Sequence, residues 1–318
     1  MSFIESPFVA ELVACAKELA HTDWCEGGAG NLSLLLRRSE VEPWLVGTPS
    51  PGTASLSYST SHTASSRDGF FLLITAAGTR LKHLTPSPDT LALLELPGYS
   101  RSSEEPERLL ETRLTWGLQG GGRPSSELAV HILGHRALIR ATGSSRALLH
   151  CHPPYCTALS IAMQPVRKEQ LNSTLWGWHS EGLTYFPEGV GLVAESQTLP
   201  PSSLMGARVT NYALPGSELL AELNALELAK HPLVFWQRHG VIAAGATFAA
   251  AFDLVEVAES IIKTGLLASQ MRFLAKPQAH NTIFPPNLLE ETRMLESVNI
   301  LRAQRDRDDR DRERDKPR

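Results

Sequence analysis

The segment at residues 147–152, ALLHCH, restricts the fold more than any other part of the chain. Its apolar run is typical of a buried strand, and it ends in His150 and His152. Because side chains of a strand alternate between two faces, these imidazoles point the same way and can bind one metal ion, while Cys151 points to the opposite face. Two prolines follow and favour the start of a helix. The segment predicts a sheet with a metal site at the end of one strand.

A third imidazole is needed, because a catalytic metal ion usually has three protein ligands and an open position. His239 is the candidate, since residues 234–245, VFWQRHGVIAAG, are two apolar runs around a turn that presents it. A rival site uses Glu127, His131 and His135, which recur every four residues on one face of an expected helix. We favour the strand pair, because isolated helix histidines are more often packed or solvated than ligating.

The other hydrophobic patterns mix helical and strand spacing, which indicates an α/β fold. Helical spacing is present in residues 8–20, 217–231 and 247–274, and strand patterns in 31–36, 70–75 and both arms of the hairpin around residue 239. Pro7 and Ser217 are suited to the starts of two of these helices. A further helix is expected to begin at Glu127, with Ser125 or Ser126 as its cap.

Composition excludes several classes of protein. The chain has 318 residues and 42% hydrophobic content, enough for a large core, and its net charge of −4 gives no reason to expect nucleic-acid binding. No apolar run approaches the length of a membrane span, the four cysteines show no disulfide spacing, and the N-terminus does not read as a secretory signal. We therefore expect a cytoplasmic protein without membrane contact.

Two stretches predict little ordered structure. Residues 46–68 are rich in Ser, Thr, Pro and Gly and predict a long surface loop. Residues 301–318 alternate acidic and basic side chains without apolar content, so they predict a disordered, solvated tail. Contact with RNA or protein through this tail is the less favoured alternative.

Five short motifs occur in a fixed order along the chain: GNLS at 30–33, TAAG at 75–78, SSE at 125–127, HCHP at 150–153 and HG at 239–240. In type and order they resemble the class II, zinc-dependent aldolase and epimerase family of sugar phosphates. Within the family, the stretches at 115–135, 186–193 and 231–263 are most similar to the L-rhamnulose-1-phosphate aldolases. The likeness covers roughly residues 5–270.

The resemblance implies one α/β catalytic domain over residues 1–275, followed by an exit segment at 276–300 and the tail. Its fold is expected to be a central, mainly antiparallel sheet flanked by helices, in three α/β/α layers. It also implies a homotetramer with sites at subunit borders. The implied reaction is reversible cleavage of a ketose 1-phosphate, L-rhamnulose 1-phosphate, to dihydroxyacetone phosphate and L-lactaldehyde through a zinc-stabilised enediolate.

The resemblance also implies a role for each site residue. His150, His152 and His239 would bind one Zn²⁺ per subunit, and three neutral imidazoles would leave its positive charge available. Glu127 would be the base at the carbon next to the carbonyl, and Glu181 would transfer a proton at the aldehyde-derived hydroxyl. The sugar phosphate would bind through backbone N–H groups and the helix end. The residues expected to contact it are Asn31, Ser33, Gly78, Ser125 and Ser126.

Two positions depart from the pattern of the rhamnulose-phosphate aldolases. Gly28 replaces an asparagine, and Ala77 replaces a hydroxyl residue, both at the expected phosphate site. Alternatives are another class II sugar-phosphate aldolase or an L-ribulose-5-phosphate 4-epimerase, and Glu181 favours an aldolase. A non-catalytic, adducin-like interaction module is the alternative from another class. The mixed-charge tail favours it, whereas the three histidines and Glu127 argue against it.

Overall fold

The computed structural model describes residues 2–46, 69–96, 112–163, 167–194 and 213–275. The expected loop at 46–68, apart from Val46, the exit segment at 276–300 and the tail at 301–318 lie outside these residues. Within them, no helix combines the length and apolarity that a membrane span would need.

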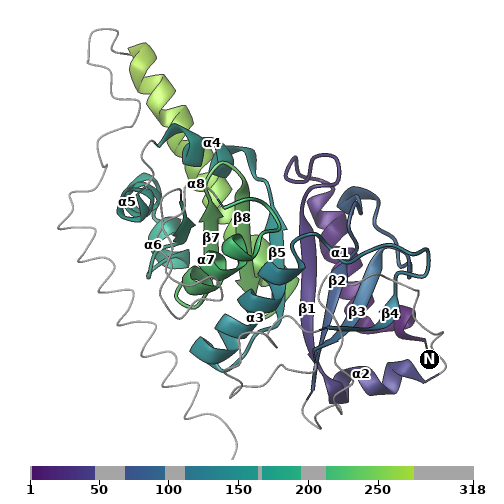
Figure 1. The fold of residues 1–318 in the computed structure, drawn as a ribbon. Helices are drawn as coiled ribbons and strands as arrows, with labels where there is room; N and C mark the ends of the chain where they lie inside the picture. The colour runs from purple at the N-terminus through teal and green to yellow at the C-terminus, as the bar shows by residue number, and fades with distance from the viewer. Residues whose placement is uncertain (1, 47–68, 97–111, 164–166, 195–212, 276–318) are drawn as a thin grey trace, which may run out of the picture.

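An eight-stranded sheet forms the centre of the molecule, in the order β4-β3-β2-β1-β5-β8-β7-β6 (Figure 1). Its strands are β1 (Asn31–Arg37), β2 (Phe70–Thr75), β3 (Leu91–Leu96), β4 (Arg113–Gly117), β5 (Ala147–Cys151), β6 (Gly191–Val193), β7 (Leu233–Trp236) and β8 (Gly240–Gly245). Neighbours pair antiparallel, except that β6 and β7 are parallel. The expectation of a mainly antiparallel sheet is confirmed.

Helices cover both faces of the sheet. They are α1 (Pro7–Leu19), α2 (Arg38–Leu45), α3 (Leu128–Thr142), α4 (Pro154–Ala162), α5 (Lys168–Trp178), α6 (Glu181–Tyr185), α7 (Glu218–Leu228) and α8 (Phe248–Ala275), with short 3₁₀ turns at Phe3–Glu5 and Leu81–His83. α3 and α7 pack together on one face, and α1 and α8 lie on the other (Figure 1). The three-layer arrangement expected from the resemblance is confirmed.

The alternation of side chains along β1 directs its polar residues toward α3. Leu32, Leu34 and Leu36 belong to the core on the α1 and α8 side, whereas Leu35 packs in the core on the α3 side. Asn31 and Ser33 share the parity of Leu35 and therefore face α3. Both faces of β1 are buried, which explains its nearly continuous apolar sequence.

The register of the sheet aligns the three strands that matter most for the site. β1 and β5 pair Asn31 with His150, and β5 and β8 pair His150 with Ile242. Cys151 lies in the core on the α1 and α8 side, as the alternation along residues 147–152 predicted. Three segments far apart in sequence therefore meet at the end of β5.

Most expected helices and strands occur where the spacing placed them, with one correction. Ser217 is the N-cap of α7 and accepts a hydrogen bond from Leu220 N at 3.2 Å. The helix expected to begin at Glu127 instead begins at Leu128, because Glu127 has a non-helical backbone and is the N-cap. Ser125 Oγ accepts from the N–H of Glu127 at 3.2 Å, so this serine closes the turn before the helix.

Candidate metal centre

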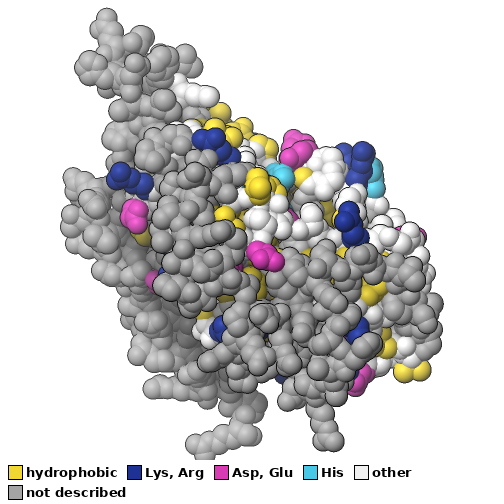
Figure 2. Space-filling view, in the orientation of Figure 1, with side chains coloured by type: hydrophobic (Ala, Val, Ile, Leu, Met, Phe, Trp, Pro, Cys, Tyr) yellow, Lys and Arg dark blue, Asp and Glu magenta, His cyan; other side chains and the backbone are white. Residues whose placement is uncertain are grey.

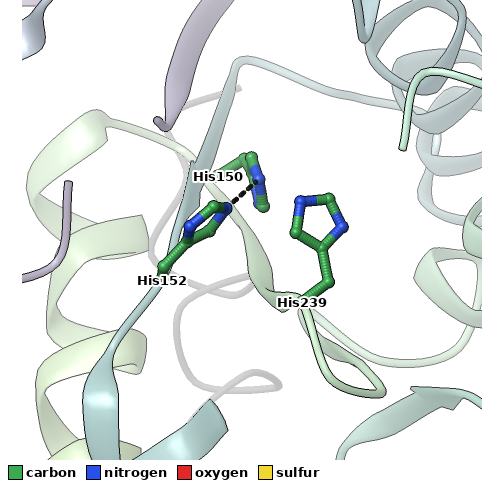
Figure 3. A group of neighbouring side chains, drawn as sticks. All are labelled: His150, His152 and His239. Atoms are coloured by element: carbon green, nitrogen blue, oxygen red, sulfur yellow. Dashed lines mark hydrogen bonds between the residues drawn. The ribbon is translucent and has the colours of Figure 1, made fainter. Parts of the chain in front are cut away.

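Three histidines converge at the end of β5, as the sequence predicted (Figure 3). His150 is on the strand, His152 follows it directly, and His239 lies in the turn between β7 and β8. One ring nitrogen from each lies within 4.8 Å of the others. The ring centroids are separated by 4.9 to 5.0 Å. Such a cluster of imidazole nitrogens is a donor set that suits a single transition-metal ion.

The β7–β8 turn can hold His239 close to β5 because the residue that follows, Gly240, has no side chain. A Cβ atom at Gly240 would lie 2.4 Å from the carbonyl oxygen of Cys151 and 2.8 Å from the ring of His152. Arg238 adopts a positive φ of 62°, a conformation that is uncommon for residues other than glycine. The tight turn therefore explains the glycine of the His-Gly motif.

Hydrogen bonds leave the Nε2 atoms of two rings free to bind a metal ion. His150 Nδ1–H donates to the carbonyl of Val241, and His152 Nδ1–H donates to Glu26 Oε1, both at 2.8 Å. The two Nε2 atoms then carry lone pairs and lie 3.2 Å apart. Nitrogens bound to one tetrahedral zinc ion at about 2.0–2.1 Å lie about 3.3 Å apart. The spacing of these two rings therefore fits this ion.

The environment keeps the imidazoles of His150 and His239 neutral. Burial lowers the pKa of His150 to about 3, and burial together with the neighbouring His150 lowers the pKa of His239 to about 4. Trp236 packs against the His150 ring, with ring centroids 4.4 Å apart and ring planes tilted by 30°. Neutral rings are the form that binds metal, so the apolar surroundings favour ligation over protonation.

Glu127 lies beside the histidine cluster. Its Oε2 is 3.4 Å from His150 Nε2, its Oε1 is 3.7 Å from His239 Nε2, and Asn31 Nδ2 donates to Oε2 at 2.9 Å. Burial raises the pKa of Glu127 above its usual range, while the bond from Asn31 and the nearby imidazoles act in the opposite direction. A buried carboxylate next to a metal site is suited to general base chemistry.

Three of the expected phosphate contacts, Gly78, Ser125 and Ser126, lie on adjoining turns. A Cβ atom at Gly28 would lie 3.7 Å from the carbonyl oxygen of Gly78, so the glycine loop and the 76–78 turn are neighbours. The N–H of Ala77 donates to Arg123 O at 2.8 Å, and the N–H of Ser125 donates to Thr75 O at 3.0 Å. Gly78 and Ser126 are exposed, whereas Ser125 is buried. Figure 2 shows histidine, acidic and basic side chains close together in the upper part of the face in view.

Asn31 and Ser33, the other two expected contacts, are buried and turned toward α3. Ser33 Oγ lies 2.6 Å from His131 Nδ1 and 2.8 Å from His135 Nε2. His131 Nε2 contacts the Asn31 carbonyl, and His135 Nδ1 lies 2.7 Å from Ser145 Oγ. Both rings are fully buried and use both nitrogens within the protein. The rival metal site on the helix is therefore wrong.

Glu181, the second expected catalytic carboxylate, is exposed at the start of α6. Its backbone N–H donates to the His179 ring at 3.2 Å, and His179 is exposed, as expected. A cavity of about 570 Å³ opens beside His152 and His239, and Glu181 is not part of its lining. Within the described residues of one subunit, Glu181 therefore does not share this cavity with the histidines.

Glu26 is a candidate site residue that the sequence patterns did not indicate. It contacts His152 and lines the cavity together with Asp23 and Arg238. A carboxylate that accepts from a ligating histidine fixes the tautomer and orientation of the ring. The only signal in the sequence was an acidic residue at the start of the glycine loop, which has no fixed spacing to the histidine that it contacts.

Comparisons with known proteins place the chain among known sequences. Residues 10–266 match the sequence model described as the class II aldolase and adducin N-terminal domain. A rhamnulose-1-phosphate aldolase from Listeria welshimeri is 28% identical over 263 residues, which are 82% of this chain and 84% of that protein. One from Yersinia pseudotuberculosis is 27% identical over 261 residues, 81% and 84% of the two chains.

Solved structures share the fold at lower identity. A sugar-phosphate aldolase from Thermotoga maritima aligns with a TM-score of 0.57 and 23% identity, covering 87% of this chain and 97% of that one. An L-fuculose 1-phosphate aldolase aligns with a TM-score of 0.52 and 17% identity, covering 94% and 97%. These likenesses concern the architecture of the sheet and its helices.

Proposed function

Because the chain belongs to the family of class II aldolases and adducin N-terminal domains, we propose that it reversibly cleaves a ketose 1-phosphate. The family match and the named relatives identify it as a class II aldehyde-lyase, similar to the rhamnulose-1-phosphate aldolases. The proposed substrate is L-rhamnulose 1-phosphate, and the products are dihydroxyacetone phosphate and L-lactaldehyde. This activity belongs to rhamnose degradation in the cytoplasm.

One observation carries the proposal: three imidazoles meet within 4.8 Å, with a buried carboxylate beside them. An aldolase must remove a proton next to a carbonyl, and the resulting carbanion is too unstable to form quickly in water. The metal ion that fits the site is Zn²⁺, held by His150, His152 and His239. When bound, it supplies Lewis-acid stabilisation of negative charge on the oxygens of the substrate.

Glu127 is the proposed base at the carbon next to the carbonyl. In the synthetic direction it takes the proton from this carbon, and in the cleavage direction it returns the proton. Its burial raises its pKa and so increases its proton affinity, while the Asn31 bond holds the carboxylate in place. Exclusion of water strengthens both effects.

The phosphate of the substrate is proposed to bind where the glycine loop, the 76–78 turn and the start of α3 adjoin. Gly78 and Ser126 are exposed there, and Ser125 supports the turn. Asn31 and Ser33 are buried and turned toward α3, so we do not propose them as direct phosphate contacts. Asn31 instead holds Glu127 in place. Gly28 and Ala77 are smaller than the asparagine and the hydroxyl residue that they replace, and they lack the polar groups of those residues. The test must therefore compare several sugar phosphates.

Glu181 is the proposed proton-transfer group at the aldehyde-derived hydroxyl. Since it does not line the cavity of its own subunit, we propose that it reaches the site of a neighbouring subunit in a homotetramer. In this proposal residues 1–275 are the catalytic domain, and residues 276–300 and 301–318 lead away from it as an exit segment and a solvated tail.

The test is release of dihydroxyacetone phosphate from a panel of ketose 1-phosphates, with and without a chelator. The proposal expects release from L-rhamnulose 1-phosphate that chelation abolishes and added Zn²⁺ restores. L-Ribulose 5-phosphate in the same panel tests the epimerase alternative. Activity that is indifferent to chelation contradicts the metal mechanism, and inactivity toward the whole panel favours an interaction module.

A further inference from the structure

Five polar side chains form a hydrogen-bonded chain that leads from the α3–β5 connection to Glu127. Its members are Ser145, His135, Ser33, His131 and Asn31. Ser145 Oγ to His135 Nδ1 measures 2.7 Å, His135 Nε2 to Ser33 Oγ 2.8 Å, Ser33 Oγ to His131 Nδ1 2.6 Å, and Asn31 Nδ2 to Glu127 Oε2 2.9 Å. His131 Nε2 contacts Asn31 Oδ1 and completes the chain.

The interior of this chain is closed to solvent. Ser33, His131 and His135 have no exposed surface, and Asn31 keeps only 6% of its exposure. A buried polar group without a partner is costly, so every donor in the chain needs an acceptor. The side chains cannot exchange partners with water, and the order of donors and acceptors is therefore set inside the protein.

The carboxylate of Glu127 fixes the direction of the whole chain. An ionised carboxylate only accepts, so the Asn31 amide must turn its N–H group toward Glu127 and its carbonyl toward His131. His131 must then carry its proton on Nε2 and accept at Nδ1 from the hydroxyl of Ser33. The Ser33 oxygen is left to accept from His135, whose proton is also on Nε2.

The outer end of the chain agrees with this order. His135 Nδ1 is an acceptor, so Ser145 donates its hydroxyl proton to it. Burial lowers the pKa of His131 well below its ordinary value and that of His135 to about 3, which keeps each ring neutral with one donor and one acceptor. Each bond therefore runs inward, from Ser145 to Glu127.

We infer that His131 is a positioning residue for Glu127: it holds the Asn31 amide in the orientation that donates to the carboxylate. Without the His131 N–H, the Asn31 carbonyl loses its buried donor, and the amide is free to turn away from Glu127. His135 and Ser33 act one step further out by fixing the tautomer of His131. The catalytic consequence rests on the proposed role of Glu127 as the base, whereas the order of the bonds does not.

Neutron diffraction from crystals of the perdeuterated, zinc-loaded protein tests the order directly. The expected result is deuterium on Nε2 of His131 and of His135, and the Asn31 amide deuterons directed at Glu127. Deuterium on Nδ1 of His131, or the Asn31 carbonyl facing the carboxylate, overturns the inference. This measurement needs no substrate, so it decides the matter even if the proposed aldolase activity fails.

Kinetics of variants test the consequence for catalysis. His131→Leu removes the donor to Asn31. We expect kcat to fall about 10- to 100-fold, which is the factor that corresponds to the loss of a hydrogen bond to a charged group. KM and the dissociation constant for zinc, measured by competition with a chromophoric chelator, are expected to stay unchanged. His131→Gln, which offers both a donor and an acceptor, is expected to recover part of kcat.

The outer members separate positioning from stability. His135→Leu removes an equally buried ring, so its stability loss should match that of His131→Leu, but its loss of kcat should be smaller. Ser145→Ala should lower kcat by no more than about threefold, since it removes one neutral hydrogen bond at the far end. Ser144→Ala, the adjacent hydroxyl outside the chain, should not lower it. A kcat that follows stability alone in this series contradicts the inference.

Discussion

Two groups of histidines in this molecule differ in one respect, the use of their second ring nitrogen. His150 and His152 each donate one N–H to the protein and leave Nε2 free at a common point. His131 and His135, on α3, use both nitrogens in bonds to serine and asparagine side chains. Burial lowers the pKa of His131, His135 and His150.

The comparison shows that a neutral, buried histidine is not thereby a metal ligand. A metal-binding histidine needs a ring nitrogen whose lone pair accepts no hydrogen bond from the protein. It also needs neighbouring ligands whose lone pairs are directed at the same metal position. The strand pair meets this condition because residues two apart share a face. The helix pair fails it because β1 places a hydroxyl between the two rings. Four predictions break or sharpen this distinction, beginning with the largest expected effect.

The first prediction removes a free nitrogen. A four-ligand structural zinc site is worth about 10–16 kcal/mol, so His150→Ala should weaken zinc binding by about 3 kcal/mol, or about a hundredfold. Aldol cleavage should be lost with the metal. The dissociation constant is measured by competition with a chromophoric chelator, and His179→Ala, at an exposed histidine, is the control. Zinc bound equally well by His150→Ala would mean that the three histidines are not the ligands.

The second prediction removes the hydroxyl between the two helix histidines. Ser33→Ala leaves a ring nitrogen of both His131 and His135 without a partner, and the expected loss of stability is about 2–4 kcal/mol. Denaturant unfolding measures it. Zinc affinity should stay at the wild-type value, because neither ring is a ligand. A variant that keeps its stability but loses zinc would reverse the assignment of the two groups.

The third prediction concerns acid stability. The pKa of His135 is about 3 in the folded protein against an ordinary value of 6.5, so the unfolded chain binds a proton first as pH falls. The stability that this neutral ring contributes is complete above pH 6.5 and is lost between pH 6.5 and 3. Between pH 7 and 5 the loss is about 2 kcal/mol.

Urea unfolding at the two pH values measures this loss against a matched variant. His135→Gln has no titrating ring. Its free energy of unfolding should therefore fall less between pH 7 and 5 than that of the wild type, and the difference is the contribution of His135, about 2 kcal/mol. Equal pH dependence in both proteins would show that the ring is already protonated, or has a solvent-accessible nitrogen, in the folded state.

Sequence patterns predicted most of the helices and strands around the site and the three histidines that meet there. Alternation along residues 147–152 placed both imidazoles on one face, and the hairpin pattern placed His239 in a turn. These are local consequences of strand geometry. The pairing of β5 with β8, which brings the turn to the strand end, was not contained in either segment, and the family resemblance supplied it.

Other parts of the site depend on contacts between segments far apart in sequence. Ser33 fits a phosphate-binding motif by type, but its hydroxyl lies between the two histidine rings of α3. Glu26 is 126 residues from His152 in the chain, and no spacing rule connects them. Side-chain partners of this kind are decided by how helices and loops pack, which residue types alone do not specify.

The smallest expected effect belongs to Glu26. It sharpens the comparison between the two groups of histidines because its bond to His152 Nδ1 leaves Nε2 of that ring available. Its side chain keeps 69% of its exposure, so water competes with the bond to His152 Nδ1. Removal of such an outer carboxylate typically weakens metal binding 10- to 100-fold, and exposure favours the lower end, about tenfold for Glu26→Gln. The same chelator competition measures it, with Asp23→Asn, a second acidic residue of the cavity, as the control. If both variants weaken zinc equally, the effect is the general negative charge of the cavity, and the specific bond to His152 contributes nothing.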